Sequence, residues 1–136
     1  MAKDTNITME VDTRKINEHN VNEHVYFHDD HSSREKGKPQ NFISKIEKGG
    51  KVLWYGKSTP DASGIIHITE IGRKSVNGEV ELLKEHPRHS KEGNAFVARV
   101  KDQFIAGEES YYVKFKIGDS DKVYLVDPKL EMASIR

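Results

Sequence analysis

Apolar and polar residues alternate with a period of two along much of this chain, and this alternation constrains the fold most strongly. Between residues 110 and 117, the apolar side of an extended chain holds Tyr111, Val113, Phe115 and Ile117. The opposite side holds Tyr112, Lys114 and Lys116. Because successive strand side chains point to opposite faces of a sheet, the pattern predicts a strand with one face on a core and one in water.

Turn signals also favour strands. Gly49-Gly50 and Asn77-Gly78 separate apolar stretches, and both pairs can adopt the positive φ angles of two-residue hairpins. The polar stretches 30–40 and 87–93 predict surface loops. The expected strands cover residues 6–13, 23–29, 41–48, 51–58, 64–74, 79–85, 94–101, 109–117 and 122–132. We therefore expect an all-β protein, a β-sandwich of eight or nine strands, immunoglobulin-like or jelly-roll in type.

The length of 136 residues fits a single sandwich domain over residues 1–136, since no stretch has the composition of a linker. Residues 1–13 are expected to form an N-terminal arm or an edge strand. The expected core residues are those on the apolar side of the clearest strands, namely Val52, Trp54, Ile66, Ile68, Phe96, Val100, Tyr111, Val113 and Phe115.

Charge and composition exclude several classes of function. The chain has 22 basic and 22 acidic residues, which argues against nucleic acid or an anionic membrane as a partner. It has no cysteine, which removes disulfides, thiolate metal sites and cysteine nucleophiles. No apolar run reaches the roughly 20 residues of a membrane span, and residues 1–6 have no apolar signal core. We expect a soluble, cytoplasmic protein without a cofactor.

The densest polar cluster predicts a candidate metal site at His24, His28, Asp30 and His31. On a strand, His24, His28 and Asp30 share one face, and imidazole with carboxylate suits zinc, nickel or copper. One strand closes a tetrahedral site poorly, so a further ligand from elsewhere in the fold is needed. The alternative interpretation is a solvated strand end that runs into a loop.

A second candidate site would bind a ligand, with carbohydrate as the chemical class. Sandwich proteins commonly bind sugars through loop carboxylates, amides and exposed aromatic rings, in some cases with calcium. The candidate residues of this kind are Asn94, Tyr112, Asp119 and Asp121. The alternative interpretation of Asp119 and Asp121 is a hairpin turn stabilised by local hydrogen bonds. The sequence has no serine elbow, Gly-rich phosphate loop or HExxH motif, so no catalytic residue is expected and the protein is not expected to be an enzyme.

Two segments of the C-terminal third are distinctive, residues 107–115 (GEESYYVKF) and residues 124–130 (YLVDPKL). Together they resemble the closing strands of the AidA/PixA family of inclusion-body proteins. Residues 48–56 (KGGKVLWYG) are similar to its hairpin, although Gly50 stands where the family more often has Asp, and Gly93-Asn94 matches its Asn-Gly turn. The family's opening is matched only by residues 9–13, and residues 14–40 do not follow it.

The resemblance implies a cytoplasmic β-sandwich with no established catalytic residues. It also implies self-association into inclusions, or binding of a ligand such as carbohydrate. No functional residue can be carried over from the family, because the matching positions are those of turns and core.

Three functions are consistent with the sequence. The first is a non-enzymatic, self-associating protein, with homo-oligomers or larger assemblies built through edge strands or through the arm at residues 1–13. The second is a lectin-like carbohydrate-binding module. The third is a metal-binding protein centred on the histidine and aspartate cluster.

Overall fold

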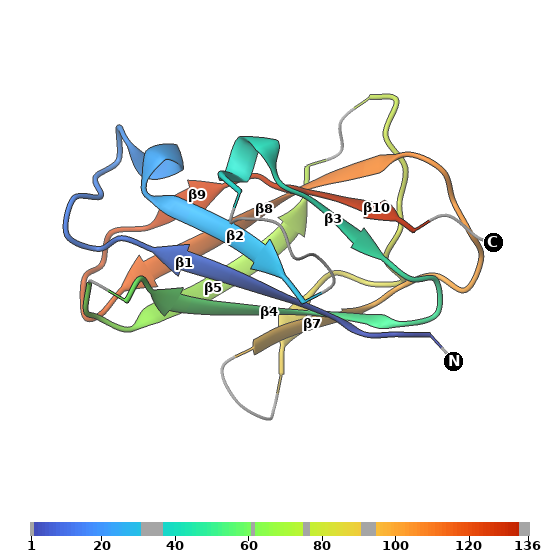
Figure 1. Cartoon of the computed structure of the whole chain (residues 1–136), viewed down its shortest axis with the longest axis horizontal. Helices are drawn as coiled ribbons and strands as arrows, with labels where there is room; N and C mark the ends of the chain where they lie inside the picture. The colour runs from blue at the N-terminus through green and yellow to red at the C-terminus, as the bar shows by residue number, and fades with distance from the viewer. Residues whose placement is uncertain (1, 31–36, 61, 75–76, 91–94, 134–136) are drawn as a thin grey trace.

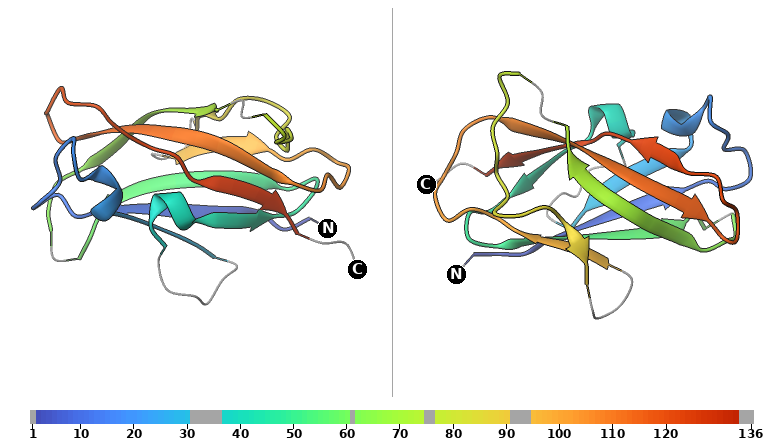
Figure 2. Two further views of the ribbon diagram at one scale, coloured as in Figure 1. Left: turned by 90° about the horizontal axis from the view of Figure 1, so that it is seen from above. Right: turned by 180° about the vertical axis from the view of Figure 1, so that it is seen from behind.

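The computed structural model describes residues 2–30, 37–60, 62–74, 77–90 and 95–133. Its strands form two mixed sheets in two layers (Figures 1 and 2), and the expected all-β class is confirmed. The first sheet has the order β2-β1-β4-β7-β6, with strands β1 (Thr5–Val11), β2 (Val25–Asp29), β4 (Lys51–Ser58), β6 (Arg88–His89) and β7 (Ala95–Arg99). The second sheet has the order β3-β10-β8-β5, and β9 also pairs with β8. Its strands are β3 (Ile43–Ile46), β5 (Ile66–Arg73), β8 (Glu108–Ile117), β9 (Tyr124–Val126) and β10 (Lys129–Met132). Two 3-10 turns, η1 (Val21–Glu23) and η2 (Pro39–Asn41), complete the described elements.

The N-terminal strand β1 is an inner strand of the first sheet. It pairs antiparallel with β2 and parallel with β4, where Ile7 lies opposite Trp54. Its alternate residues Ile7, Met9 and Val11 are buried, so removing β1 would open the core. The expectation of an arm or edge strand over residues 1–13 is therefore corrected: pairing on both sides leaves the backbone of β1 no free edge.

The Gly49-Gly50 pair does form a tight turn, but not the expected hairpin. Gly49 has φ 79°, and the N–H of Gly50 donates to the carbonyl of Glu47 at 3.1 Å. The turn connects β3 of the second sheet to β4 of the first. A Cβ on Gly50 would lie 2.7 Å from the carbonyl oxygen of Lys3, because the N-terminal segment passes directly over the turn.

The segment expected as a strand at residues 79–85 crosses between the sheets instead of joining one. The N–H of Val80 donates to the carbonyl of Glu108 in β8, whereas that of Lys84 donates to Arg99 in β7. Since its hydrogen bonds go to both sheets, the segment forms only an isolated bridge, between Leu83 and Val100. The prediction of a hairpin at Asn77-Gly78 is also wrong, because β5, the strand that precedes this pair, hydrogen-bonds with β8 instead of with the segment that follows the turn.

Two further boundaries differ from expectation. The short strand β6 lies within the stretch 87–93 expected as a loop. The stretch 122–132 is divided into β9 and β10 at Asp127-Pro128, because proline has no N–H to donate to a ladder.

The core lies between the two sheets and contains most of the expected residues. Val52, Trp54, Ile66, Phe96, Val100, Tyr111, Val113 and Phe115 are buried, and Ile68 is partly buried against them. On one side of the molecule the layers are joined by Ser44, whose hydroxyl donates to Asp29 at 2.6 Å, and by the stacked rings of Phe27 and Phe42, with centroids 5.3 Å apart.

Candidate functional site

A carboxylate lies buried on the outward side of the first sheet. Glu10 falls between the inward residues Met9 and Val11 of β1, yet its side chain is only 2 % exposed. Its Oε2 atom lies 2.8 Å from Nε2 of His28 on β2 and 4.0 Å from Nζ of Lys57 on β4. We call Glu10, His28 and Lys57 the Glu10 cluster. Its contacts connect the three neighbouring strands β2, β1 and β4.

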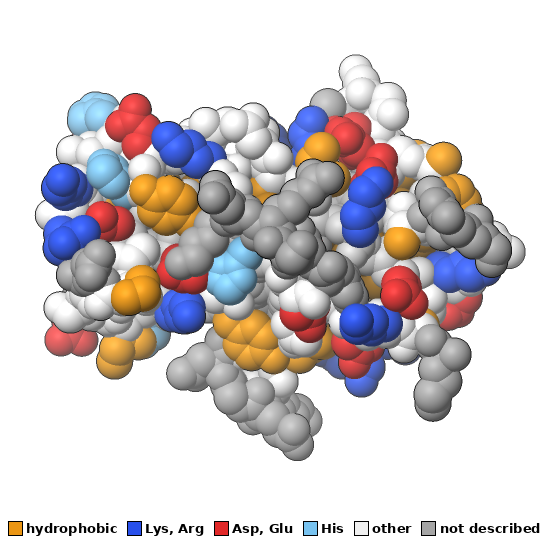
Figure 3. Space-filling model, in the orientation of Figure 1, with side chains coloured by type: hydrophobic (Ala, Val, Ile, Leu, Met, Phe, Trp, Pro, Cys, Tyr) orange, Lys and Arg blue, Asp and Glu red, His pale blue; other side chains and the backbone are white. Residues whose placement is uncertain are grey.

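The register explains why these side chains meet. Glu10 lies opposite Tyr26 in β2 and opposite Lys57 in β4, while Thr8 lies opposite His28. The outward side chains of three strands therefore form regular rows across the sheet. In Figure 3, which views the molecule from the side of the first sheet, acidic and basic side chains are interspersed instead of gathered by sign.

The candidate metal ligands are not brought together on this face. His28 belongs to the Glu10 cluster, and Asp30 accepts two hydrogen bonds from Asn6, from the backbone N–H at 3.0 Å and from Nδ2 at 2.7 Å. His24 precedes β2, where its carbonyl accepts from the N–H of Asp12 at 2.9 Å. His31 lies outside the described residues. Within the described ranges, no three residues among His, Asp and Glu are grouped so that they could hold a metal ion.

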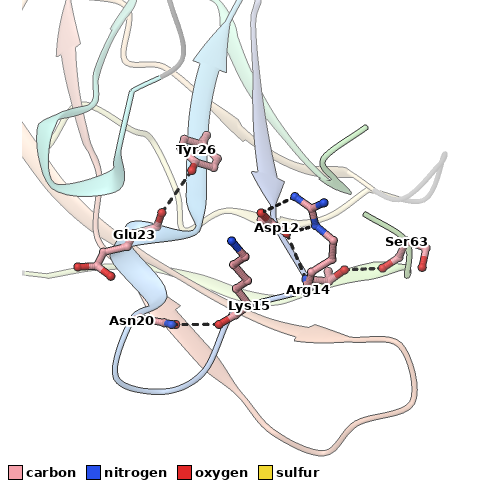
Figure 4. Close-up of polar contacts among 8 residues, drawn as sticks. Asp12, Arg14, Lys15, Asn20, Glu23, Tyr26 and Ser63 are labelled. Atoms are coloured by element: carbon pink, nitrogen blue, oxygen red, sulfur yellow. Dashed lines mark hydrogen bonds and ion pairs between the residues drawn. The ribbon is translucent and has the colours of Figure 1, made fainter. Parts of the chain in front are cut away.

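The loop between β1 and β2, residues 12–24, is held by local polar contacts (Figure 4). The Arg14 guanidinium hydrogen-bonds both carboxylate oxygens of Asp12, at 3.0 and 3.1 Å, and lowers the pKa of Asp12 to about 2. The side-chain amide of Asn20 donates to the backbone carbonyl of Lys15 at 3.0 Å, and the Tyr26 hydroxyl donates to the backbone carbonyl of Glu23 at 3.3 Å. These contacts shape the loop and hold the histidine-containing segment at the end of the first sheet.

Tyr112, the candidate aromatic ligand residue, is engaged with its own sheet. Its ring lies across Gly72 of β5, where any Cβ would collide with it. Its hydroxyl donates to Glu70, and this carboxylate raises the pKa of Tyr112. Nζ of Lys114 lies over the ring, 5.5 Å from its centroid. The ring is thus held between the backbone of β5 and an ammonium group.

The other candidate ligand residues lie elsewhere. Asp119 and Asp121 are exposed in the turn between β8 and β9, whose hairpin geometry fits the second interpretation of these residues. Tyr112 lies five residues before the end of β8, about 16 Å at ~3.3 Å per residue, so it is far from that turn. Asn94 lies outside the described residues.

The outer side of the second sheet carries a series of ion pairs. Each joins a lysine to an acidic residue: Lys45 to Glu131, Lys74 to Asp127, Lys114 to Glu70 and Lys129 to Glu108. All four pairs connect different segments of the fold, and all are partly exposed. Such pairs contribute little to stability individually, about 0–1 kcal/mol, so their main effect is to make this surface nearly neutral.

Sequence reasoning missed the Glu10 cluster and a second buried carboxylate, Glu109. The Oε2 atom of Glu109 accepts from Nε of Arg73 at 2.7 Å, and Oε1 accepts from the N–H of Leu82 at 2.7 Å. Both glutamates lie in stretches expected to be strands, residues 6–13 and 109–117. The position of Glu109 on the same side as Tyr111 was the one signal that could have indicated burial.

Comparison with known proteins identifies a family and a shared fold. A family model described as a domain of unknown function, DUF8788, matches residues 3–123. Among solved structures, the inclusion body protein PixA from Burkholderia cenocepacia J2315 matches with a TM-score of 0.70 and 18% identity, over 98% of this chain and 97% of that one. No curated protein matches the sequence. The resemblance to this inclusion-body family is thus confirmed, at the level of the fold. Among the described residues, no helix has the length and apolar character to cross a membrane.

Proposed function

The chain belongs to the DUF8788 family, and we propose that it is a non-catalytic, cytoplasmic protein that self-associates in the manner of an inclusion body protein. The observation that carries the proposal is the fold shared with PixA over nearly the whole of both chains. Because almost no part of either chain falls outside the match, the likeness extends to the whole fold of both chains.

The charge balance supports self-association. The net charge is zero, so copies of the chain meet without long-range repulsion. The four ion pairs on the outer side of the second sheet balance positive and negative charge on that surface as well. Two copies of a surface with mixed charges can meet without the general repulsion that two surfaces of the same charge would experience.

The polar clusters support a non-catalytic role. The Glu10 cluster and the Glu109 carboxylate both connect strands or segments of the fold, as structural ion pairs do. Tyr112, with one side on Gly72 and Lys114 over its ring, is poorly placed to stack on a sugar. We therefore favour assembly over the lectin-like and metal-binding alternatives.

We take residues 1–136 as one sandwich domain. The parallel pairs β1–β4 and β3–β10 give it mixed sheets, whereas immunoglobulin and jelly-roll sandwiches have antiparallel sheets. The proposed domain is therefore a sandwich related to these types, with a parallel pair in each sheet.

The proposal is tested by producing the untagged protein at rising levels in bacterial cells and isolating any particles. We expect particles that dissolve in mild buffer without denaturant and release folded protein with a β-sheet circular dichroism spectrum. Protein that stays in the supernatant as a monomer at every level contradicts the proposal, as do particles that dissolve only in denaturant. Elemental analysis and a glycan screen with calcium would then test the alternatives.

A further inference from the structure

Exposed apolar side chains gather on one side of the molecule. Among the described residues, the large hydrophobic side chains with substantial exposure are Ile43, Tyr55, Ile65, Phe104, Val123 and Leu125. Four of them, Ile43, Ile65, Val123 and Leu125, lie on or directly beside strands of the second sheet, and their exposed fractions are 41–63%. The first sheet has only Tyr55, and Phe104 lies in the connection between β7 and β8.

Strand alternation places Ile43 of β3 and Leu125 of β9 on the outer side of the second sheet, because the neighbouring residues Ser44, Tyr124 and Val126 are buried. Ile65 and Val123 directly precede β5 and β9, and both are exposed. Val123 and Leu125 are two positions apart in the chain, and we treat them as one apolar pair. We call the outward side of the second sheet, with its ion pairs and these four residues, the outer face.

The charges of the outer face indicate what covers it. Its acidic residues Glu70, Glu108, Asp127 and Glu131 each pair with a lysine. A face on which each of these carboxylates is paired with a lysine does not fit a polyanion or an anionic membrane, which need an excess of one sign. It fits a surface with the same balance, and a second copy of the chain provides one.

The sheet edges are less suited to joining copies. The edge strand β2 is bridged to Gly37, with Phe27 and Gly37 exchanging hydrogen bonds of 2.7 and 2.8 Å. At the opposite edge of the first sheet, β6 has only two residues. In the second sheet, the edge strands β3 and β9 are four and three residues long, and β5 has a bulge between Ile68 and Glu70. Short, bridged and bulged edges are those that resist pairing with another chain.

We propose that copies of this chain associate through the outer face, with Val123 and Leu125 at the centre of the contact. The inference rests on the proposed function, since it names the surface by which self-association occurs. Apolar residues at the centre and charged pairs around them match the usual anatomy of a protein interface.

The test compares two lysine substitutions at exposed apolar positions in purified, untagged protein. Leu125→Lys places a charge on the outer face, whereas Phe104→Lys, the matched control, places one outside the sheet. We expect Leu125→Lys to raise the dissociation constant of self-association at least about tenfold, measured by sedimentation velocity, and Phe104→Lys to leave it unchanged. Circular dichroism and urea unfolding verify that both variants fold.

A second measurement does not depend on disrupting the contact. Because the chain has no cysteine, Leu125→Cys and Phe104→Cys each introduce a single thiol. We expect the rate of maleimide labelling at Leu125→Cys to fall as protein concentration rises, and that at Phe104→Cys to stay constant. If the wild-type protein associates but Leu125→Lys associates equally and the thiol at 125 stays reactive, the outer face is not the interface. If the wild-type protein does not associate at all, the proposed function itself fails.

Discussion

The indole Nε1 of Trp54 donates a hydrogen bond of 3.0 Å to the hydroxyl of Tyr111, and this bond joins the two sheets inside the core. The two rings meet edge-on, with centroids 5.6 Å apart and an interplanar angle of 64°. Trp54 belongs to β4 and Tyr111 to β8, so the contact connects residues 57 positions apart in the chain. Burial raises the pKa of Tyr111, so its side chain stays neutral, and the phenol oxygen accepts the bond through a lone pair.

Replacing Trp54 should therefore be costly. We expect Trp54→Ala to lower the free energy of unfolding by roughly 3–5 kcal/mol, since it leaves a large cavity between the sheets. Tyr111→Phe keeps the ring and removes only the hydroxyl, so it should cost about 1–3 kcal/mol by leaving the buried indole N–H without an acceptor. Urea unfolding followed by tryptophan fluorescence for Tyr111→Phe, and by circular dichroism for both, measures the two values. A loss under about 1 kcal/mol for Trp54→Ala would contradict its position in the core.

The buried Glu109 is expected to hold the crossing segment 79–85 against the core. Glu109→Ala leaves the buried Leu82 N–H without its acceptor and removes one partner of the Arg73 guanidinium, which keeps Glu81, so we expect a cost of about 1–3 kcal/mol. Glu81→Ala is the matched control, because Glu81 also contacts Arg73 at 2.6 Å but its side chain is 56% exposed. We expect a cost under about 1 kcal/mol for the control. Equal costs in urea unfolding would show that the burial of Glu109 does not matter.

Gly56 allows the two sheets to approach each other closely. A Cβ at this position would lie 2.9 Å from Cγ2 of Ile66, the first residue of β5. We expect Gly56→Ala to lower stability by about 1–3 kcal/mol through overpacking. Adding Ile66→Ala relieves that contact, so the double variant should cost less than the two single changes together. Strict additivity in thermal unfolding would rule out the steric explanation.

The Asp12–Arg14 pair predicts a pH dependence of stability. The pKa of Asp12 in the folded protein is about 2, below its ordinary value of 3.8, because the Arg14 guanidinium stabilises the carboxylate. The contribution of ionised Asp12 is therefore fully present above pH 3.8 and is lost as the pH falls through about 2. The stability difference between the wild-type protein and Asp12→Asn should be constant from neutral pH to about 4 and shrink below it. Urea unfolding at a series of pH values measures it, and a difference independent of pH would exclude the proposed stabilisation.

The sequence predicts strands and core well where the determinants are local. Alternation around Tyr111 and the apolar side of the stretch containing Trp54 identified β8 and β4, and eight of the nine expected core residues are buried. Sheet membership depends on distant pairing, which local patterns do not specify. The Gly49-Gly50 turn has the geometry expected of it, yet it leads from one sheet to the other because β1 occupies the position beside β4.

The candidate sites were less predictable for the same reason. His28 stood out in the sequence, but its partner Glu10 is 18 residues away and meets it only through the register of β1 and β2. Tyr112 was correctly expected to face outward. The residues that contact its ring and its hydroxyl, Gly72 and Glu70, belong to a different strand, β5. Alternation predicts the direction of a side chain but not the neighbours that it finds there.

The native mass of untagged wild-type protein, measured by size-exclusion chromatography with light scattering over a range of concentrations at low and moderate salt, tests self-association most directly. The account predicts species heavier than the 15.5 kDa chain, with a weight-average mass that rises with concentration. A single 15.5 kDa species at the highest concentration and at every salt level would contradict it.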